Sequence, residues 1–403
     1  MNIGDIHDCF GCGVCALACG KGIIDLRLNA DGFYEPVIVA PDQCTDCGLC
    51  LDVCSYNYQD LALQKAELLS YAAWSKYDEV GLKCSSGGVS YEIGRRLLDD
   101  GYKVCGVRFN SHDNRAEHYI AETLAELEQS IGSKYIQSYT LNGFKNLNRK
   151  EKYLITGTPC QIDSFRRYIQ RFHCEDHFIL LDFFCHGVPS KLMWDKYVRQ
   201  VEEKVGKLTA VSWRSKLSGW HGSYVIGIDG AKDCDNANGI LSHGRRYFSK
   251  YSKGDSFYLL FLSNSCLCKA CYDKCRFKYD QSSADIRIGD LWGQTYKDDD
   301  KGVSAVLTLT KRGKQLFESS NCFLVSHPMA IVAEGQMKAN PLRPAYAQKV
   351  LDSLKDANCS ISHAAIYPKR ERKRRLWRGR INHLFRILKI DYQINEDKNN
   401  NLS

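Results

Sequence analysis

The sequence predicts an α+β protein: a small cysteine-rich domain at the N-terminus, a larger α/β domain behind it and a basic helical tail. Four cysteines fall within residues 9–19 and four more within residues 44–54. From about residue 64, strand-like segments alternate with amphipathic segments, which is typical of α/β domains. Residues 369–389 hold ten Lys or Arg and one Glu. We therefore expect domains at 1–63, 64–365 and 366–403.

Composition indicates the compartment. The chain has 403 residues, 44% hydrophobic and 25% charged, as in globular proteins. Its first ten residues do not resemble a signal peptide, and its longest apolar run, FYLLFL at 257–262, is far shorter than the ~18 residues of a membrane span. We expect a cytoplasmic protein. Thiols stay reduced in that compartment, so twenty cysteines favour metal binding over a secreted disulfide scaffold.

The two N-terminal cysteine runs repeat one motif. CFGCGVCALAC at 9–19 and CTDCGLCLDVC at 44–54 share the spacing C-x2-C-x2-C-x3-C. A pair of such runs is the signature of a dicluster ferredoxin, in which each 4Fe-4S cluster takes three cysteines from one run and the last cysteine of the other. The predicted ligands are Cys9, Cys12, Cys15 and Cys54 for one cluster, and Cys44, Cys47, Cys50 and Cys19 for the second.

Between the runs, two β-rich segments around an Asp-Gly pair predict a hairpin. A domain of about 60 residues is too small to rely on apolar burial alone, so we expect the clusters to form part of its core. The alternative is a pair of zinc sites, because C-x2-C pairs also bind zinc. Zinc would leave the extra cysteines of each run without a role.

A proline usually follows each cysteine run in such domains, but Gly20 and Ser55 stand at these positions here. This replacement leaves all eight predicted cysteine ligands in place.

Three strand-turn-helix units follow in the larger domain. They contain the segments CSSGGVSYEIGRRLLDDG, KYLITGTPCQIDSFRRYIQRF and FILLDFFCHGVPSKLMWDKYVRQV. Such turns direct the backbone N–H groups of a helix N-terminus at an anion such as phosphate. Each turn alone is weak evidence. Three of them behind a predicted ferredoxin domain favour a redox cofactor that carries phosphate.

Six motifs of this domain occur in a specific order: SSGGVS at 85–90, GSKYIQS at 132–138, GTPCQI at 157–162, FCHGVPS at 184–190, WRSKLSGWHG at 213–222 and ADIRIGDLWG at 284–293. In this order they resemble the coenzyme F420 hydrogenase/dehydrogenase beta-subunit family, over about residues 68–355. The resemblance implies a flavoprotein that binds FAD and iron-sulfur clusters and passes electrons between a hydride carrier, a deazaflavin or a nicotinamide, and those clusters. It does not fix the substrate, because relatives of this fold differ in function.

Roles toward FAD can be argued for residues of the first two motifs. Ser86, Gly87 and Gly88 would let the backbone approach a pyrophosphate at the N-terminus of the following helix. Lys134 would supply a positive charge to phosphate or to the reduced flavin ring, unless it is a solvated lysine. Tyr135 would stack on a ring.

The later motifs add further candidates. Gly157, Thr158 and Gln161 surround a second turn that the flavin can approach closely. Asp290 follows a β-rich run, at a strand end where ligands gather in α/β sheets, although a turn aspartate would also fit there. His186 would be the catalytic candidate, since a histidine can protonate flavin or substrate near neutral pH. The alternative is a histidine that only hydrogen-bonds a sulfur or a carbonyl.

A third group of cysteines lies in NSCLCKACYDKCRF: Cys266, Cys268, Cys271 and Cys275. The resemblance implies a third 4Fe-4S cluster that uses a cysteine pair from this region with cysteines from elsewhere in the domain. The predicted ligands are Cys160, Cys185, Cys271 and Cys275. The family pair generally has C-x2-C spacing, which Cys268 and Cys271 have and Cys271 and Cys275 do not, so the pair stays open. A local zinc knuckle of all four is the alternative.

The tail explains the basicity of the chain. Residues 369–389 carry a charge of +9 and the whole chain +8, so the remainder sums to about −1, and nucleic-acid binding by the body has no support. Apolar residues recur along the tail at helical spacing: Trp377, Ile381, Leu384, Phe385 and Leu388. This pattern is typical of a helix that lies on a membrane or docks on a partner protein. Docking on its own domain is the alternative.

Together these features predict an iron-sulfur flavoprotein oxidoreductase. FAD would exchange a hydride with a carrier or substrate, and the 4Fe-4S clusters would exchange single electrons with a redox partner protein or a ferredoxin. The alternative is an electron-transfer adaptor without catalysis, which delivers electrons to a partner enzyme, for example in cell-surface polysaccharide synthesis. An iron-sulfur sensor is a third hypothesis, but the sequence shows no DNA-binding motif.

Overall fold

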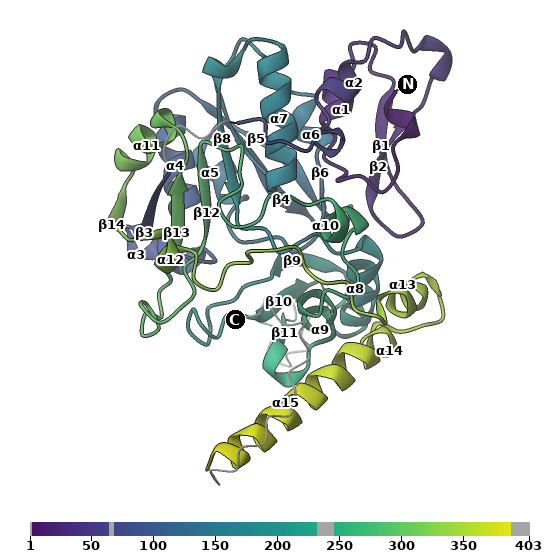
Figure 1. Cartoon of the computed structure of the whole chain (residues 1–403), viewed down its shortest axis with the longest axis vertical. Coiled ribbons are helices and arrows are strands. Elements are labelled where there is room, and N and C mark those ends of the chain that lie inside the picture. The colour runs from purple at the N-terminus through teal and green to yellow at the C-terminus, as the bar shows by residue number, and fades with distance from the viewer. Residues whose placement is uncertain (1, 64–67, 232–245, 388–403) are drawn as a thin grey trace, which may run out of the picture.

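The computed structural model describes residues 2–63, 68–231 and 246–387, with side chains as far as residue 382. Figure 1 shows a mixed body of helices and sheet, with the N-terminal domain packed at its upper right. The long helix α15 (Ile366–Ile387) extends from the lower end of this body.

The N-terminal domain is built around the predicted hairpin. Strands β1 (Ile24–Leu28) and β2 (Tyr34–Ile38) pair antiparallel, between the short helices α1 (Val14–Ala18) and α2 (Leu49–Asp52). Each helix follows a glycine in the left-handed region, Gly13 at φ 74° and Gly48 at φ 78°. Glycine adopts this conformation at little cost, which explains why both runs carry a Gly directly after their second cysteine.

The body contains one large sheet. Its nine strands are β3 (Leu69–Ser75), β4 (Lys103–Asn110), β5 (Arg115–Ala121), β6 (Ser138–Tyr139), β7 (Tyr153–Thr156), β8 (Phe178–Phe183), β12 (Ile286–Asp290), β13 (Ser304–Thr308) and β14 (Cys322–Ser326). Their order is β14-β3-β13-β12-β8-β7-β4-β5-β6. The central strands β12, β8, β7 and β4 are parallel, as the predicted α/β pattern requires. Antiparallel pairs flank them on both sides, so the sheet is mixed.

Helices cover both faces of this sheet. On one face lie α4 (Val89–Asp99), α5 (Leu124–Glu128) and α11 (Lys311–Glu318), and on the other lie α6 (Leu141–Phe144) and α7 (Pro159–Arg171). Successive side chains of β8 point to opposite faces of the sheet, so this strand contributes to the apolar core on each face. Leu180 packs in the core on the α7 side, and Ile179 packs in the core on the α4 side. Val14 of α1 belongs to the α7 core, so the N-terminal domain packs on this side of the sheet.

A second layer covers the lower end of the body. Strands β9 (Leu208–Ser212), β10 (Val225–Gly230) and β11 (Arg246–Lys250) form an antiparallel sheet in the order β11-β10-β9. They share a core with α8 (Lys191–Val205), α9 (Ser256–Leu262), α13 (Ala347–Lys355) and α14 (Ile361–Ala364). Short helices α3 (Asp78–Lys83), α10 (Lys269–Asp273) and α12 (Met329–Val332) complete the body.

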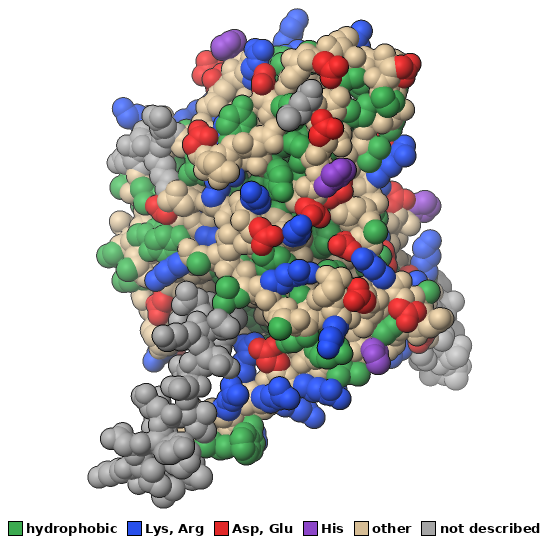
Figure 2. Space-filling view, turned by 45° about the vertical axis from the view of Figure 1, so that its right-hand side comes forward, with side chains coloured by type: hydrophobic (Ala, Val, Ile, Leu, Met, Phe, Trp, Pro, Cys, Tyr) green, Lys and Arg blue, Asp and Glu red, His purple; other side chains and the backbone are tan. Residues whose placement is uncertain are grey.

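The first turns of helix α15 contact the body. Arg372 donates a hydrogen bond to the carbonyl oxygen of Ser252, and Tyr346 donates to Glu371. Farther along, Leu376 and Trp377 are 55% and 65% exposed, and Figure 2 shows Lys and Arg side chains gathered at the lower edge of the molecule. The side chains of Leu384, Phe385 and Leu388 lie outside the described residues. No helix in the described part of the chain is long and apolar enough to cross a membrane.

Candidate functional site

Four cysteines from the two N-terminal runs surround one small cavity. Cys9, Cys12 and Cys15 come from the first run and Cys54 from the second, and all four are buried. Burial raises the pKa of the Cys15 thiol, and the charges of Cys12, Cys9 and Cys54 raise it further. The structure thus brings together the first predicted ligand set, including the exchange of the last cysteine between runs.

The second predicted set lies nearer the surface. Burial raises the pKa of Cys50, and the neighbouring charges of Cys47 and Cys19 act in the same direction. Cys44 packs into the same apolar cluster as Cys19 and Cys50. Cys47 is exposed, whereas the other three thiols are half-buried. The two sets are adjacent, because the charge of Cys50 also acts on Cys54.

The third predicted set also comes together. Cys160 lies in the first turn of α7 and Cys185 follows β8, while Cys271 lies in α10 and Cys275 just beyond it. Burial raises the pKa of Cys160, and the charges of Cys185 and Cys271 raise it further. Burial likewise raises the pKa of Cys185 to about 12, where the charges of Cys271 and Cys275 contribute. The Cys271 and Cys275 pair is therefore the one that faces Cys160 and Cys185.

The two remaining cysteines of this segment differ in position. Cys266 Sγ lies 3.5 Å from the Met193 sulfur, in the core of the lower layer. Cys268 packs beside Cys160, Cys271 and Cys275, and its Sγ donates to the carbonyl oxygen of Cys9 at 3.4 Å. Because Cys266 lies in a different core, the four cysteines do not gather into a local zinc knuckle. Among the described residues, no three His, Cys, Asp or Glu side chains converge as ligands of a single ion, whereas a cubane cluster holds its thiolates farther apart.

A buried lysine lies beside the third set. Lys278 is 7% exposed, and its Nζ donates to the carbonyl oxygens of Cys185 at 2.6 Å and His186 at 3.0 Å. Burial raises the pKa of the thiols of Cys185 and Cys275, and the positive charge of Lys278 opposes that rise. A buried cation requires a counter-charge. No carboxylate in the described part of the chain pairs with Lys278, so cluster-bound thiolates at this site fit its surroundings.

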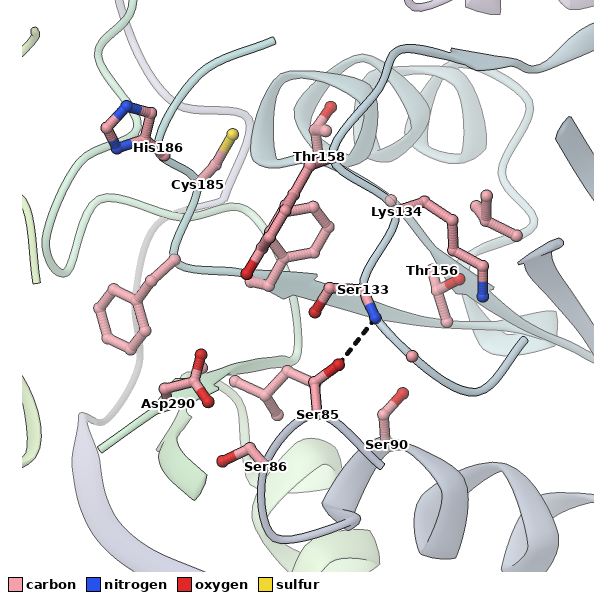
Figure 3. Close-up of a pocket in the computed structure, with 18 of the residues that line it drawn as sticks. Ser85, Ser86, Ser90, Ser133, Lys134, Thr156, Thr158, Cys185, His186 and Asp290 are labelled. Atoms are coloured by element: carbon pink, nitrogen blue, oxygen red, sulfur yellow. Dashed lines mark hydrogen bonds between the residues drawn. The ribbon is translucent and has the colours of Figure 1, made fainter. Parts of the chain in front are cut away.

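A cavity of about 410 Å³ lies at the carboxyl ends of β7, β8 and β12, where ligands bind in parallel sheets. The predicted residues that line it are Ser86, Gly88, Lys134, Tyr135, Gly157, Thr158, Gln161, His186 and Asp290. Figure 3 shows Ser85, Ser86 and Ser90 on one side of this cavity and Cys185 and His186 on the other. The cavity thus spans from the loop before α4 to the third cysteine set.

The SSGG loop begins α4 at one end of the cavity. Gly88 has φ +84°, and a Cβ there would lie 2.9 Å from Val80. The Ser85 hydroxyl accepts a hydrogen bond from the Ser133 amide at 2.9 Å (Figure 3). Gly87 does not line the cavity. A Cβ on Gly87 would lie 2.5 Å from the Ala73 carbonyl oxygen, so this glycine allows the loop to pack on β3 instead.

Two lysines flank this loop. The Lys134 Nζ donates to the carbonyl oxygens of Ser130 at 2.8 Å and Ile131 at 3.0 Å, and burial lowers its pKa to about 7. The Lys216 Nζ donates to the carbonyl oxygen of Ser86 at 2.8 Å, and burial lowers its pKa to about 8. Sequence reasoning did not single out Lys216, although it lies in the WRSK motif, because the sequence does not show which lysine turns inward.

An arginine that the sequence analysis also missed organises the wall of the cavity. Arg214 donates to Asp290 at 3.0 Å and to the Tyr135 hydroxyl at 3.1 Å. Its guanidinium lies 5.0 Å from the ring centroids of both Tyr224 and Trp292. Asp290 is the last residue of β12, as predicted. Its carboxylate is engaged by Arg214, so its position in the structure is that of an anchor for the wall.

The turn between β7 and α7 joins the cavity to the third set. The Thr158 amide donates to the Gln161 side chain at 2.8 Å, and the Thr158 hydroxyl lies 3.2 Å from Cys160 Sγ. The Gln161 amide donates to Ser138 at 3.2 Å, so this side chain shapes the turn. Because Cys160 starts α7 from the same turn, the cavity wall and the cysteine set share one backbone segment.

His186 lies at the end of the cavity nearest the cysteines. Its ring packs on Phe261 at a centroid separation of 4.8 Å. Its Nε2 is buried and has no hydrogen-bond partner among the described residues. Burial lowers the pKa of His186 to about 4, so the ring is neutral near pH 7. In this state the imidazole can accept a proton or hydrogen-bond a ligand, but it carries no charge.

Two family models match parts of the chain, and one solved structure is similar to it. Residues 150–324 match the family model for the C-terminal part of the coenzyme F420 hydrogenase/dehydrogenase beta subunit, and residues 8–58 match the model of a 4Fe-4S dicluster domain. A chain of the xenon-derivatised F420-reducing [NiFe] hydrogenase complex from Methanosarcina barkeri is similar at 16% identity and a TM-score of 0.43, covering 75% of this chain and 92% of that one. No curated protein matches the chain.

Proposed function

The chain carries the C-terminal domain of the coenzyme F420 hydrogenase/dehydrogenase beta-subunit family behind a 4Fe-4S dicluster domain, and on this premise we propose that it is an iron-sulfur flavoprotein oxidoreductase. Its cavity would hold FAD, and its three cysteine sets would each hold a 4Fe-4S cluster. When bound, FAD exchanges a hydride with a carrier or substrate and single electrons with the clusters.

One observation carries this proposal. A single cavity has the N-terminus of an eleven-residue helix at one end and a ligand of the third cysteine set at the other. The α4 residues Val89, Ser90 and Tyr91 line it at the first end, and Cys185 at the second. A dinucleotide needs an anion site for its pyrophosphate, and its ring must lie near the electron acceptor. This cavity offers both in one space.

Different residues of the cavity would bind the pyrophosphate and position the flavin ring. At the α4 end, the half-buried Lys134 lines the cavity, and its positive charge would attract a pyrophosphate. Lys216 does not line the cavity, and its Nζ holds the loop through the Ser86 carbonyl oxygen. In the middle, Tyr135 stacks on Phe261 at 5.0 Å and supplies a flat apolar wall. Arg214 fixes the Tyr135 hydroxyl, so this wall is already oriented before a ring enters.

The three cysteine sets follow one another from the cavity to the surface. Cys185 of the third set lines the cavity, and Cys160 of that set lies near enough to Cys12 of the first set for their charges to interact. The first set meets the second through Cys54 and Cys50. The second set ends at the exposed Cys47. This order supports electron transfer between the cavity and a redox partner protein or ferredoxin that docks near Cys47.

The hydride carrier would be a deazaflavin or a nicotinamide. The family name favours a deazaflavin of the F420 type, and the same cavity would have to admit it beside the flavin. The competing proposal is an electron-transfer adaptor that holds clusters but no flavin. The cavity argues against it, because an adaptor has no need for a pyrophosphate site beside its innermost cluster.

The test is an anaerobic preparation assayed for iron, acid-labile sulfide and extractable flavin. We expect about twelve irons and one FAD per chain, since each cubane holds four irons. About eight irons would leave the third set without a cluster. NADH, a reduced deazaflavin and a reduced ferredoxin are then offered in turn, and flavin bleaching identifies the donor. A chain with full clusters and no extractable FAD would support the adaptor and overturn the oxidoreductase proposal.

A further inference from the structure

Lys278 is held rigidly beside the third cysteine set. Arg287 is fully buried and forms a two-pronged ion pair with Asp182, at 2.7 Å for each contact. The same guanidinium donates to the carbonyl oxygens of Phe277 at 3.0 Å and Tyr279 at 2.9 Å. These two residues flank Lys278. Its backbone is therefore pinned on both sides, while its Nζ is held by two carbonyl oxygens near Cys185.

The charge of Lys278 lies close to the third set. Its Nζ is 2.6 Å from the carbonyl oxygen of Cys185, and Lys278 follows Cys275 by three residues. Within the described part of the chain, the groups that accept hydrogen bonds from this Nζ are the neutral carbonyls of Cys185 and His186, so its charge is not paired with a carboxylate.

The surroundings of the first set have the opposite sign. The Glu35 carboxylate accepts a hydrogen bond from the Asp8 amide at 2.8 Å, directly beside Cys9. Residues 1–63 as a whole hold nine Asp or Glu and two Lys or Arg. The third set thus lies beside a fixed cation, and the N-terminal sets lie in an acidic domain.

Net charge near a cluster helps to set its reduction potential. Adding an electron makes a cluster more negative, so a buried cation stabilises the reduced form and carboxylates destabilise it. We propose that Lys278 is a positioning residue that gives the third cluster the highest reduction potential of the three. Electrons that enter through the dicluster domain would then collect beside the cavity, so the chain would favour reduction of the ligand bound there. This inference rests on the proposed function.

The matched control is a second caged lysine. Lys196 is 8% exposed, and its Nζ donates to the carbonyl oxygens of Asp356 at 2.7 Å and Cys359 at 2.6 Å. It lies on α8, in the lower layer of the fold. Lys196→Gln therefore removes a buried lysine charge that is also held by two backbone carbonyl oxygens, but that lies away from the cysteine sets.

The experiment is an anaerobic redox titration of the full chain followed by EPR. A Cys275→Ala chain, which lacks a ligand of the third set, identifies the signal of the third cluster by subtraction. We expect this signal to have the highest midpoint potential in the unsubstituted chain. Lys278→Gln should lower that potential alone, Lys278→Arg should restore most of it, and Lys196→Gln should leave all three unchanged.

The iron content shows whether a failed test concerns the role of Lys278 or the third cluster itself. About eight irons in the unsubstituted chain would remove the third cluster and overturn this inference, while the flavin content still decides the oxidoreductase proposal. With about twelve irons, a third cluster that is not the highest in potential overturns only the role of Lys278. An unchanged potential in Lys278→Gln, or an equal fall in Lys196→Gln, does the same. If the Lys278→Gln chain does not assemble its clusters, the inference is tested by the unsubstituted chain alone. It then stands if the third cluster has the highest midpoint potential of the three and is overturned if it does not.

Discussion

The side-chain oxygen of Ser164 lies 3.4 Å from the sulfur of Cys12. Ser164 is on α7, one turn after Cys160, and it also accepts a hydrogen bond from the Ser55 amide at 3.0 Å. The Ser164 hydroxyl itself donates to the Ser55 side-chain oxygen at 2.8 Å. A cluster-bound Cys12 has no proton to donate, so its sulfur would become the acceptor, and the Ser164 hydroxyl would turn from Ser55 to supply this hydrogen bond. Helix α7 thus holds a cysteine of the third set, Cys160, and contacts a cysteine of the first, Cys12.

Ser164→Ala should lower the reduction potential of the first cluster. Hydrogen bonds to cluster sulfurs raise the potential because they stabilise the more negative, reduced state. One such bond is worth about 1 kcal/mol, which corresponds to a shift on the order of tens of mV for one electron. The measurement is an EPR-monitored titration. Ser164→Thr keeps the hydroxyl and serves as the control. An equal shift in both variants would show that the packing, not the hydrogen bond, sets the potential.

Gly88→Ala should reduce FAD content as well as stability. Its φ of +84° is strained for alanine, and its Cβ would lie 2.9 Å from Val80 at the start of α4. The backbone strain alone costs about 1–2 kcal/mol. Gly101 is the control, because its φ is +77° and nothing lies within 4 Å of a Cβ there.

Both variants should therefore lose stability in urea unfolding, Gly88→Ala by more because its Cβ also meets Val80, and only Gly88→Ala should also lose extractable flavin. Full flavin in Gly88→Ala would separate the SSGG loop from cofactor binding. Loss of flavin in Gly101→Ala would mean that lowered stability alone accounts for the effect.

Sequence patterns predicted which cysteines group together, because the two cysteine runs repeat one motif. They did not predict contacts between two single residues that are far apart in the chain. Exchange of Cys54 between the two runs follows from their spacing, and the structure brings Cys54 to the first set. Ser164 lies 152 residues from Cys12, and no pattern connects two such positions. The outer strands of the sheet were not predicted either. Strand β13 lies between β12 and β3 and pairs antiparallel with both, whereas an alternation of strands and helices indicates parallel strands.

Lys278 and Arg214 show a second limit of sequence reasoning. Both are ordinary basic residues in sequence, and most lysines and arginines are solvent-exposed. Their roles come from burial: Lys278 is 7% exposed and Arg214 6%. Burial of a single charged side chain is decided by tertiary packing, so it becomes visible only when the elements around it are in place.

Shortening the chain after Arg372 should leave the fold and cofactors intact. Residues 373–380 of α15 are exposed, whereas Glu371 and Arg372, which the shortened chain keeps, hydrogen-bond to the body. We expect the shortened chain to retain its iron and flavin and to unfold within a few degrees of the full chain, about the change that 1 kcal/mol produces in a large domain. Lower iron or flavin content would assign the tail a role inside the molecule.

FAD binding should weaken as the pH rises from about 7. Burial lowers the pKa of Lys134 from 10.5 to about 7, so the free protein loses this charge progressively above that pH. A bound pyrophosphate favours the ammonium form and raises its pKa again. Binding then takes up a proton, and affinity falls with rising pH in the window between the two pKa values.

The measurement is the dissociation constant of FAD for flavin-stripped protein, from fluorescence quenching between pH 6 and about 9. Lys134→Arg stays charged across this window and should give a flatter profile. Lys134→Met should bind weakly at every pH, with less pH dependence than the unsubstituted chain. Parallel profiles for the unsubstituted chain and Lys134→Arg would place the pyrophosphate away from Lys134.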